Sequence, residues 1–313
     1  MTLPHRDLRV VGDAQADSEI DLIMIAGIGT SPVERWAIIT PWWREFLATT
    51  DSKVRMLAFD HPIAANDEVV LDTFSEQADV LLEVLSLHLQ KHANKRPLLF
   101  MCHSLGSIIL KQALGKANAQ SHQYTSLLHA LLGVVFLGAP HSAADPELLA
   151  ESVLGILRSV PNGVVVKQAS TRLEELRRLS MTSQLFQDTQ LRIEILSLYE
   201  NETTKVRIGR TEGRSKMTFN VKTWKDLVDE RLARTMTGHE QCYSLAGNHD
   251  DLCKLLEEQP RRPDHRMRTW FQFVLSMTAR LDVEHHLQSA QLPESPHLTG
   301  TSLSSWDMTK LVL

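Results

Sequence analysis

The stretch that most constrains the fold of this chain is the hexapeptide at residues 102–107, Cys-His-Ser-Leu-Gly-Ser. An apolar run precedes it at residues 97–101, and an apolar helical pattern follows it at residues 108–115. This context predicts a tight turn from a buried strand into a helix, with Ser104 lifted out of the sheet at the tip of the turn. The backbone doubles back at such a turn, so the residues two before and two after the serine must be small, and Cys102 and Gly106 fit that demand. We therefore interpret the hexapeptide as a nucleophile elbow.

Buried strands alternate with helices through the first 140 residues. Near-continuous apolar runs predict strands that are buried on both faces, at residues 20–26, 54–59, 97–101 and 132–137, with a later one at 191–198. Helical spacing of apolar residues predicts helices between them, at residues 36–47, 72–92 and 104–116. Such alternation predicts an α/β fold with a mainly parallel sheet and right-handed crossovers.

The second half of the chain breaks this alternation. Residues 145–190 carry amphipathic helical patterns over a length that is unusual for a loop. We interpret this segment as a helical lid insertion, with two sheet-covering helices as the alternative. Residues 203–216 predict an exposed polar and basic loop, followed by short strands at 217–221 and 225–228, and a last helix is expected at 266–281. We expect one domain over residues 1–281 and a poorly ordered tail over residues 282–313.

Composition narrows the class of protein. The net charge is −5, which gives no electrostatic reason to expect nucleic acid as a partner. The chain shows no signal sequence and no apolar run long enough for a transmembrane segment, and its cysteines are few, so we expect a cytoplasmic protein. The spacing of His239, Cys242, His249 and Cys253 resembles that of zinc ligands, but the middle gap is short and no second cluster supports it. We therefore expect no metal and no cofactor, and the oligomeric state stays open.

A serine hydroxyl is a weak nucleophile, so Ser104 needs a base within hydrogen-bond reach and an acid that orients the base. In a strand, turn and helix context of this kind the order along the chain is serine, acid, histidine. Glu200 follows the predicted strand at 191–198 and is our expected acid, with Glu202 and Asp229 as alternative acids. His249 lies in a turn-rich loop near the end of the domain and is our expected base.

Three other histidines compete with His249 for the role of base. His239 precedes a predicted strand, and His141 follows one. His103 is adjacent to the serine, where neighbouring side chains point in different directions, so we interpret it as a packing or hydrogen-bonding group. The position of His249 in a late loop suits a proton carrier best.

The oxyanion of a tetrahedral intermediate needs preformed hydrogen-bond donors. One donor is expected to be the backbone N–H of Leu105, the residue after the serine. The second is expected from the loop after an early strand, where Ile28 lies between two glycines that let the backbone approach closely.

Five segments, at residues 21–29, 100–114, 135–141, 199–200 and 248–254, together resemble the serine esterase/lipase-like α/β-hydrolases that are common in fungi. Members of that family occur alone or at the front of larger NACHT or ankyrin proteins, and they are related to serine-active-site proteins linked to phospholipid remodelling. The resemblance runs from about residue 8 to about residue 255 and implies an α/β-hydrolase fold with Ser104 as nucleophile, His249 as base and Glu200 as acid. Two positions depart from the family pattern: Ala26 replaces its usual histidine, and Ser107 replaces a common glycine.

The residues and the resemblance together predict an enzyme that cleaves a carboxylic ester through an acyl-enzyme intermediate. The apolar helical patterns at residues 145–190 favour a hydrophobic acyl or lipid-like substrate. The same triad would serve a lactonase, thioesterase or transacylase that acts on a specialised metabolite. A non-catalytic interaction module on a hydrolase fold is the alternative from a different class.

Overall fold

The computed structural model describes residues 8–11, 18–28, 53–63, 71–91, 96–141, 145–159, 181–189, 191, 193–211, 218–249, 252 and 265–277. The helix expected at 36–47 and the tail at 282–313 lie outside the described residues, as does the middle of the expected lid. Within the described part of the chain, no helix is both long and apolar enough to cross a bilayer.

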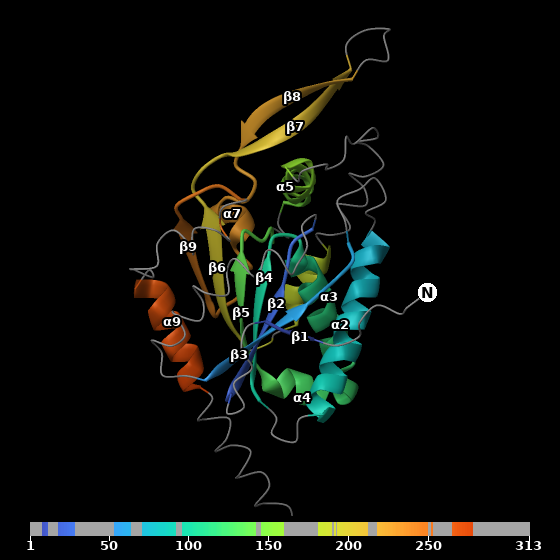
Figure 1. Cartoon of the computed structure of the whole chain (residues 1–313), viewed down its shortest axis with the longest axis vertical. Helices are drawn as coiled ribbons and strands as arrows, with labels where there is room; N and C mark the ends of the chain where they lie inside the picture. The colour runs from blue at the N-terminus through green and yellow to red at the C-terminus, as the bar shows by residue number, and fades with distance from the viewer. Residues whose placement is uncertain are drawn as a thin grey trace, which may run out of the picture.

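A seven-stranded sheet forms the centre of the molecule (Figure 1). The edge strand β1 runs antiparallel to β3, and every other pair of neighbours is parallel. In spatial order the strands are β1 (Arg9–Val10), β3 (Val54–Phe59), β2 (Ile20–Ile25), β4 (Leu98–His103), β5 (Leu131–Leu137), β6 (Glu194–Glu200) and β9 (Glu240–Leu245).

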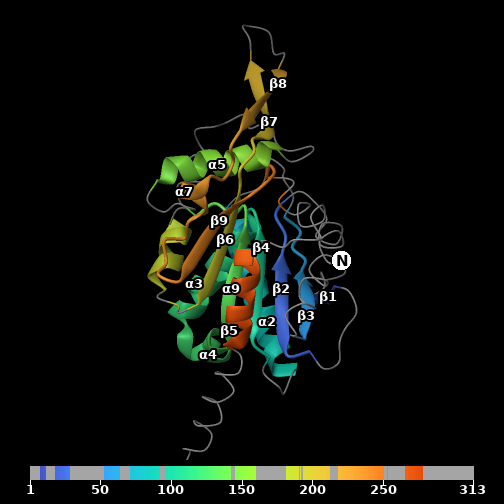
Figure 2. The same ribbon diagram turned by 90° about the vertical axis from the view of Figure 1, so that its left-hand side faces the viewer.

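The central strands β2, β4 and β5 are buried along their whole length because helices cover both faces of the sheet. One face packs against α2 (Leu71–Lys91), α3 (Gly106–Ala119) and α4 (Ser121–Ala130), and the other against α9 (His265–Ser276) (Figures 1 and 2). The helix α5 (Pro146–Ser159) lies across the edge where the parallel strands end (Figure 2). The molecule is therefore a three-layer α/β structure, in which the sheet lies between two layers of amphipathic helices.

The strand order reverses between β2 and β4. The chain moves from β2 outward to β3, then crosses back over β2 to β4 and continues through β5, β6 and β9 to the other edge. A crevice at the carboxyl ends of the strands is expected at such a reversal, and ligands of open α/β sheets bind there. The loop after β2 and the turn after β4 meet at this point.

The predicted α/β-hydrolase fold is confirmed, and the predicted strands match β2, β3, β4, β5 and β6 closely. The strand predicted at 217–221 is largely confirmed, since residues 218–221 begin β8 (Thr218–Lys225). The loop predicted at 203–216 is wrong where it contains the strand β7 (Thr204–Thr211), and residues 226–228 of the second predicted strand lie outside any strand. β7 and β8 form one antiparallel ribbon. In β7, Lys205 and Arg207 alternate with Val206 and Ile208, which is the period-two pattern of a strand. The high polarity of the segment obscured this pattern.

Candidate active site

Ser104 occupies a strained turn directly after β4. Its φ is 52°, in the left-handed region that residues with a side chain adopt rarely. Its N–H donates to the Leu137 carbonyl at 2.8 Å, and its side chain is 2 % exposed. Gly106 completes the turn, because a Cβ there would lie 2.3 Å from the Ala26 carbonyl oxygen. A serine with positive φ between a strand and a helix has the geometry of a nucleophile elbow.

Three side chains form a hydrogen-bonded chain at this edge of the sheet. Ser104 Oγ lies 2.8 Å from His249 Nε2, and His249 Nδ1 lies 3.1 Å from Glu200 Oε2. A carboxylate accepts but does not donate, so Nδ1 carries the ring hydrogen and Nε2 is left to accept the serine hydroxyl. All three side chains are buried. This order of contacts allows His249 to remove the hydroxyl proton while Glu200 fixes the ring.

Backbone donors hold Glu200 in place at the end of β6. Its Oε1 accepts the N–H groups of Leu227 and Val228 at 3.0 and 2.7 Å, which leaves Oε2 for His249. The alternative acids lie elsewhere: Glu202 is exposed, and Asp229 accepts the Leu232 N–H as the N-cap of α7 (Glu230–Ala233). The strand expected at 225–228 is therefore wrong beyond Lys225, where β8 ends, and Asp229 begins a helix instead of following a strand. Of the three carboxylates, Glu200 is the one that contacts His249 among the described residues.

Two residues that the sequence did not single out position His249. Thr204, the first residue of β7, accepts the His249 backbone N–H on its Oγ1 at 2.9 Å. Gly138 follows β5 with a φ of 53°, and a Cβ there would lie 3.0 Å from His249 Cε1 and 3.1 Å from Nδ1. The glycine therefore makes room for the imidazole. Its place directly after a buried strand is the signal that could have revealed it.

The loop after β2 lies against the nucleophile, as expected for an oxyanion-binding loop. A Cβ on Gly27 would lie 3.0 Å from Ser104 Cβ. The residues Leu105 and Ile28 are buried, and their backbone N–H groups have no acceptor among the described residues. Buried N–H groups are almost always paired, and within the described residues these two are left available for an anion.

His61 supports this loop and was missed in the sequence. Its Nε2 lies 2.7 Å from the Ala26 carbonyl oxygen and donates to it. Burial lowers the pKa of His61, although the Ala26 carbonyl and Asp60 oppose that change, so the ring stays neutral. The methyl side chain of Ala26 cannot form a hydrogen bond within its own loop. His61, which follows the neighbouring strand β3, donates a hydrogen bond to the loop instead.

A buried lysine lies behind the elbow on α3. Lys111 Nζ donates to the Pro140 carbonyl at 3.1 Å and to Ser183 Oγ at 2.8 Å, and no carboxylate among the described residues pairs with it. Burial lowers the pKa of Lys111 to about 7. The neighbouring His141 packs its ring edge on Phe136, and burial, with a smaller effect of Lys111, puts the pKa of His141 well below its usual value. His141 therefore remains a neutral packing group.

The zinc-like series does not gather in the described structure. Both ring nitrogens of His249 are bonded to Ser104 and Glu200. Cys242 is a free thiol whose pKa is raised to about 12, mainly by burial, and zinc requires the thiolate. Cys253 lies outside the described residues, and no group of three metal-ligating side chains occurs among the described ones.

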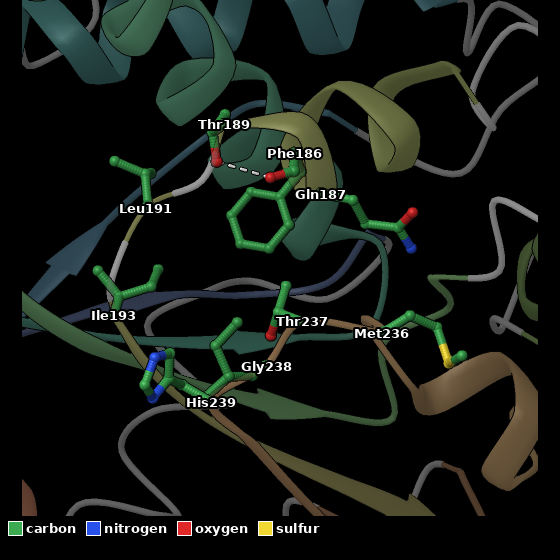
Figure 3. Close-up of a pocket in the computed structure, with 10 residues that line it drawn as sticks. Phe186, Gln187, Thr189, Leu191, Ile193, Met236, Thr237, Gly238 and His239 are labelled. Atoms are coloured by element: carbon green, nitrogen blue, oxygen red, sulfur yellow. Dashed lines mark hydrogen bonds between the residues drawn. The ribbon is translucent and has the colours of Figure 1, made fainter.

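A separate cavity of about 290 Å³ lies at the opposite edge of the sheet (Figure 3). The Phe186 ring points into it, beside Leu191 and Ile193 at the start of β6, and His239 borders it at the start of β9. Ser104, His249 and Glu200 do not line this cavity. His239 lies 3.5 Å from Glu194 and, like the cavity, is remote from the carboxyl edge that holds Ser104.

No protein-family model matches the chain, and no curated protein matches it. Among solved structures, the chain is similar to a lipase-esterase related protein from Clostridium acetobutylicum, with 11 % identity and a TM-score of 0.48 over 81 % of this chain and 96 % of that one. It is also similar to carboxylesterase CesB from Bacillus subtilis, with 13 % identity and a TM-score of 0.39 over 80 % and 83 % of the two chains. A monoacylglycerol lipase from Paleococcus ferrophilus gives 11 % identity and a TM-score of 0.42 over 83 % and 94 %.

These likenesses are distant, and the fold stands on features of the chain itself. The sheet order reverses beside the strand that carries Ser104, the serine occupies a turn with positive φ, and the last parallel strands deliver a carboxylate and a histidine to the same edge. The chain therefore has an α/β-hydrolase fold.

Proposed function

We propose that this protein is a serine hydrolase that cleaves a carboxylic ester through an acyl-enzyme intermediate. The observation that carries the proposal is the continuous hydrogen-bonded chain from Ser104 Oγ through His249 to Glu200, buried at the carboxyl edge of the sheet. A structural histidine has no need of a serine hydroxyl on one nitrogen and a buried carboxylate on the other. This arrangement does what acyl transfer requires.

In the proposed reaction His249 Nε2 takes the Ser104 proton as Oγ attacks the ester carbonyl. The imidazolium that forms is stabilised by Glu200, and the oxyanion accepts the N–H groups of Leu105 and Ile28. His249 then gives its proton to the leaving alcohol, and an acyl group remains on Oγ. A water molecule, deprotonated by the same imidazole, attacks the acyl carbon and releases the carboxylic acid and the free serine. No step needs a metal or an organic cofactor.

The proposed substrate is a hydrophobic acyl or lipid-like ester, with residues 145–190 as the lid that shapes the acyl pocket. The amphipathic helix α5 supports this choice, because it lies across the edge that holds Ser104. The proposal places the chain with the fungal serine esterase/lipase-like hydrolases on the motifs that it shares with them. It also places the protein in the cytoplasm, where the thiols of Cys102 and Cys242 would stay reduced.

A fluorophosphonate probe tests the proposal directly, because it phosphonylates an activated serine. We expect labelling of the wild-type protein and none of Ser104→Ala. A panel of p-nitrophenyl esters of rising chain length then tests the substrate class, and Ser104→Ala should lower kcat by about 10⁴-fold or more. A folded wild-type protein that resists the probe would instead indicate a non-catalytic interaction module. Turnover of lactones or thioesters in preference to every oxygen ester would favour the second enzyme class.

A further inference from the structure

The ribbon of β7 and β8 projects away from the main sheet (Figures 1 and 2). Its inner end is anchored, since Val206 is 1 % exposed within the core and β7 contacts α5. Two eight-residue strands span about 26 Å, so the ribbon's outer end lies well beyond the body of the protein. The ribbon is not part of the main sheet, and Thr204 at its base is the ribbon residue that contacts His249 at the proposed site.

The charge of the ribbon is opposite to that of the whole chain. The net charge of the chain is −5, yet the two strands contain five basic residues and no acidic one: Lys205, Arg207, Arg210, Lys222 and Lys225. The register pairs Lys205 with Trp224 and Arg207 with Lys222, two positions along. Residues two apart in a strand share a face, so these four positions belong to one face of the ribbon.

An exposed aromatic residue lies among these cations. Trp224 is 62 % exposed, and Lys205 Nζ lies 5.6 Å from the centre of its ring. Tryptophan beside lysine and arginine is typical of surfaces that meet a membrane interface, where the ring enters the headgroup region and the cations pair with anionic lipid.

The base of the ribbon is connected to the catalytic histidine. β6 ends at Glu200, and β7 begins four residues later at Thr204, whose Oγ1 accepts the His249 N–H at 2.9 Å. The ribbon therefore leaves the body at the same edge that holds Ser104. Whatever the ribbon binds lies beyond the edge of the sheet that holds Ser104 and His249.

We propose that the β7–β8 ribbon docks on an anionic phospholipid surface and so presents the Ser104 edge to esters held in that surface. The docking itself is independent of catalysis, whereas the presentation of esters rests on the proposed function. A cytoplasmic leaflet is anionic. Each lysine or arginine near its surface raises the affinity of a protein for the leaflet by about fivefold.

A projecting ribbon suits a planar surface better than a nucleic acid. The Debye length at physiological salt is about 8 Å, so a bilayer that contacts the ribbon's outer part is screened from the acidic body. A nucleic acid strand bound along the ribbon would also approach that body, including the exposed acids Glu202 and Asp226 at the ribbon's base. The length and charge of the ribbon therefore favour the lipid surface.

Co-sedimentation with vesicles tests the docking, with the Ser104→Ala protein as the parent so that hydrolysis cannot alter the lipid. We expect binding to vesicles of phosphatidylcholine with phosphatidylserine, weak binding to phosphatidylcholine alone, and release in about 1 M salt, where the Debye length falls to about 3 Å. Adding Arg207→Ala and Lys222→Ala, a register pair on the face that carries Trp224, should weaken binding to the anionic vesicles by about 25-fold, the product of two fivefold losses.

A matched control removes the same charge from the far end of the molecule. Lys53 precedes β3 and Lys91 ends α2, and both are exposed at the amino edge of the sheet. The Lys53→Ala, Lys91→Ala protein should bind anionic vesicles like the parent. Equal weakening by the two pairs of substitutions would overturn a ribbon-specific site. So would a parent that ignores anionic vesicles, or one that binds an oligonucleotide but no vesicle.

Activity assays keep this inference separate from the proposed hydrolysis. In a protein that retains Ser104, the ribbon variant should hydrolyse a soluble short ester at the wild-type rate but an ester embedded in anionic vesicles more slowly. A wild-type protein that binds vesicles and resists the fluorophosphonate probe would refute the hydrolase and leave the docking intact. A ribbon variant with unchanged turnover of the embedded ester would refute the presentation of substrate.

Discussion

Replacement of Gly138 by alanine probes the support of His249, the proposed catalytic base. The residue has a φ of 53°, and a left-handed conformation costs a residue with a side chain about 1–2 kcal/mol. The added Cβ would lie 2.7 Å from Leu252 Cδ1 and 3.0 Å from His249 Cε1, and overpacking of this kind costs about 1–3 kcal/mol. We therefore expect the free energy of unfolding to fall by about 2–5 kcal/mol. The imidazole must also shift by a few tenths of an ångström, which should lower kcat by about tenfold or more.

Urea unfolding and the rate of fluorophosphonate labelling measure the two effects. Gly115 provides the control, because it lies inside α3 and a Cβ there meets nothing within 4 Å. Gly115→Ala should raise the free energy of unfolding by about 0.5–1 kcal/mol through its helix propensity and leave labelling unchanged. If Gly138→Ala keeps both its stability and its labelling rate, the argument that this glycine makes room for the imidazole is wrong.

Three further predictions test other parts of the structure. Glu200→Gln should lower kcat by about 10⁴-fold, as loss of a triad acid does, whereas Glu202→Gln should leave turnover of a soluble ester unchanged. The pKa of Lys111 is about 7 in the folded protein and about 10.4 in an unfolded chain, so the unfolded chain holds the extra proton between these pH values. The free energy of unfolding should therefore rise across this range by up to about 1.4 kcal/mol per pH unit. Urea titrations of Lys111→Met should show no such rise. Burial raises the pKa of Asp21, but hydrogen bonds from His88 and Arg55 outweigh burial, so the net pKa is lowered. The ionised carboxylate should therefore stabilise the fold above about pH 4, and this stabilisation should be lost as the pH falls further. Asp21→Asn should lose about 3–5 kcal/mol at neutral pH, measured by urea unfolding, and flatten the acid limb of the stability curve.

The sequence was sufficient for the strands that are buried on both faces. Residues 54–59 were predicted as a strand and form β3, and the predicted 132–137 differs from β5 by one residue. Such strands are apolar at nearly every position, with Arg55 the exception in β3, so their signal does not depend on their neighbours. The turn at Ser104 was also predictable, because the demand for small residues around it is local.

The remaining features depend on contacts between segments that are distant in the sequence. The support of Ala26 by His61 joins two loops after neighbouring strands, and the support of Glu200 by the N–H groups of Leu227 and Val228 uses backbone that carries no sequence signal. The strand β7 was missed because this polar segment has too few apolar residues for its alternation to stand out. Such features follow from the tertiary fold.

The end of β5 is shared by the groups around the active site. The Leu137 carbonyl accepts the Ser104 N–H, the next residue faces the His249 ring, and its own N–H donates to Leu198 on β6. Ser104 and His249 are therefore both held by the end of β5, and fraying of this strand end would misalign both residues together. Heat inactivation is accordingly expected to coincide with the cooperative melting of the sheet, with no inactive but otherwise folded species preceding it.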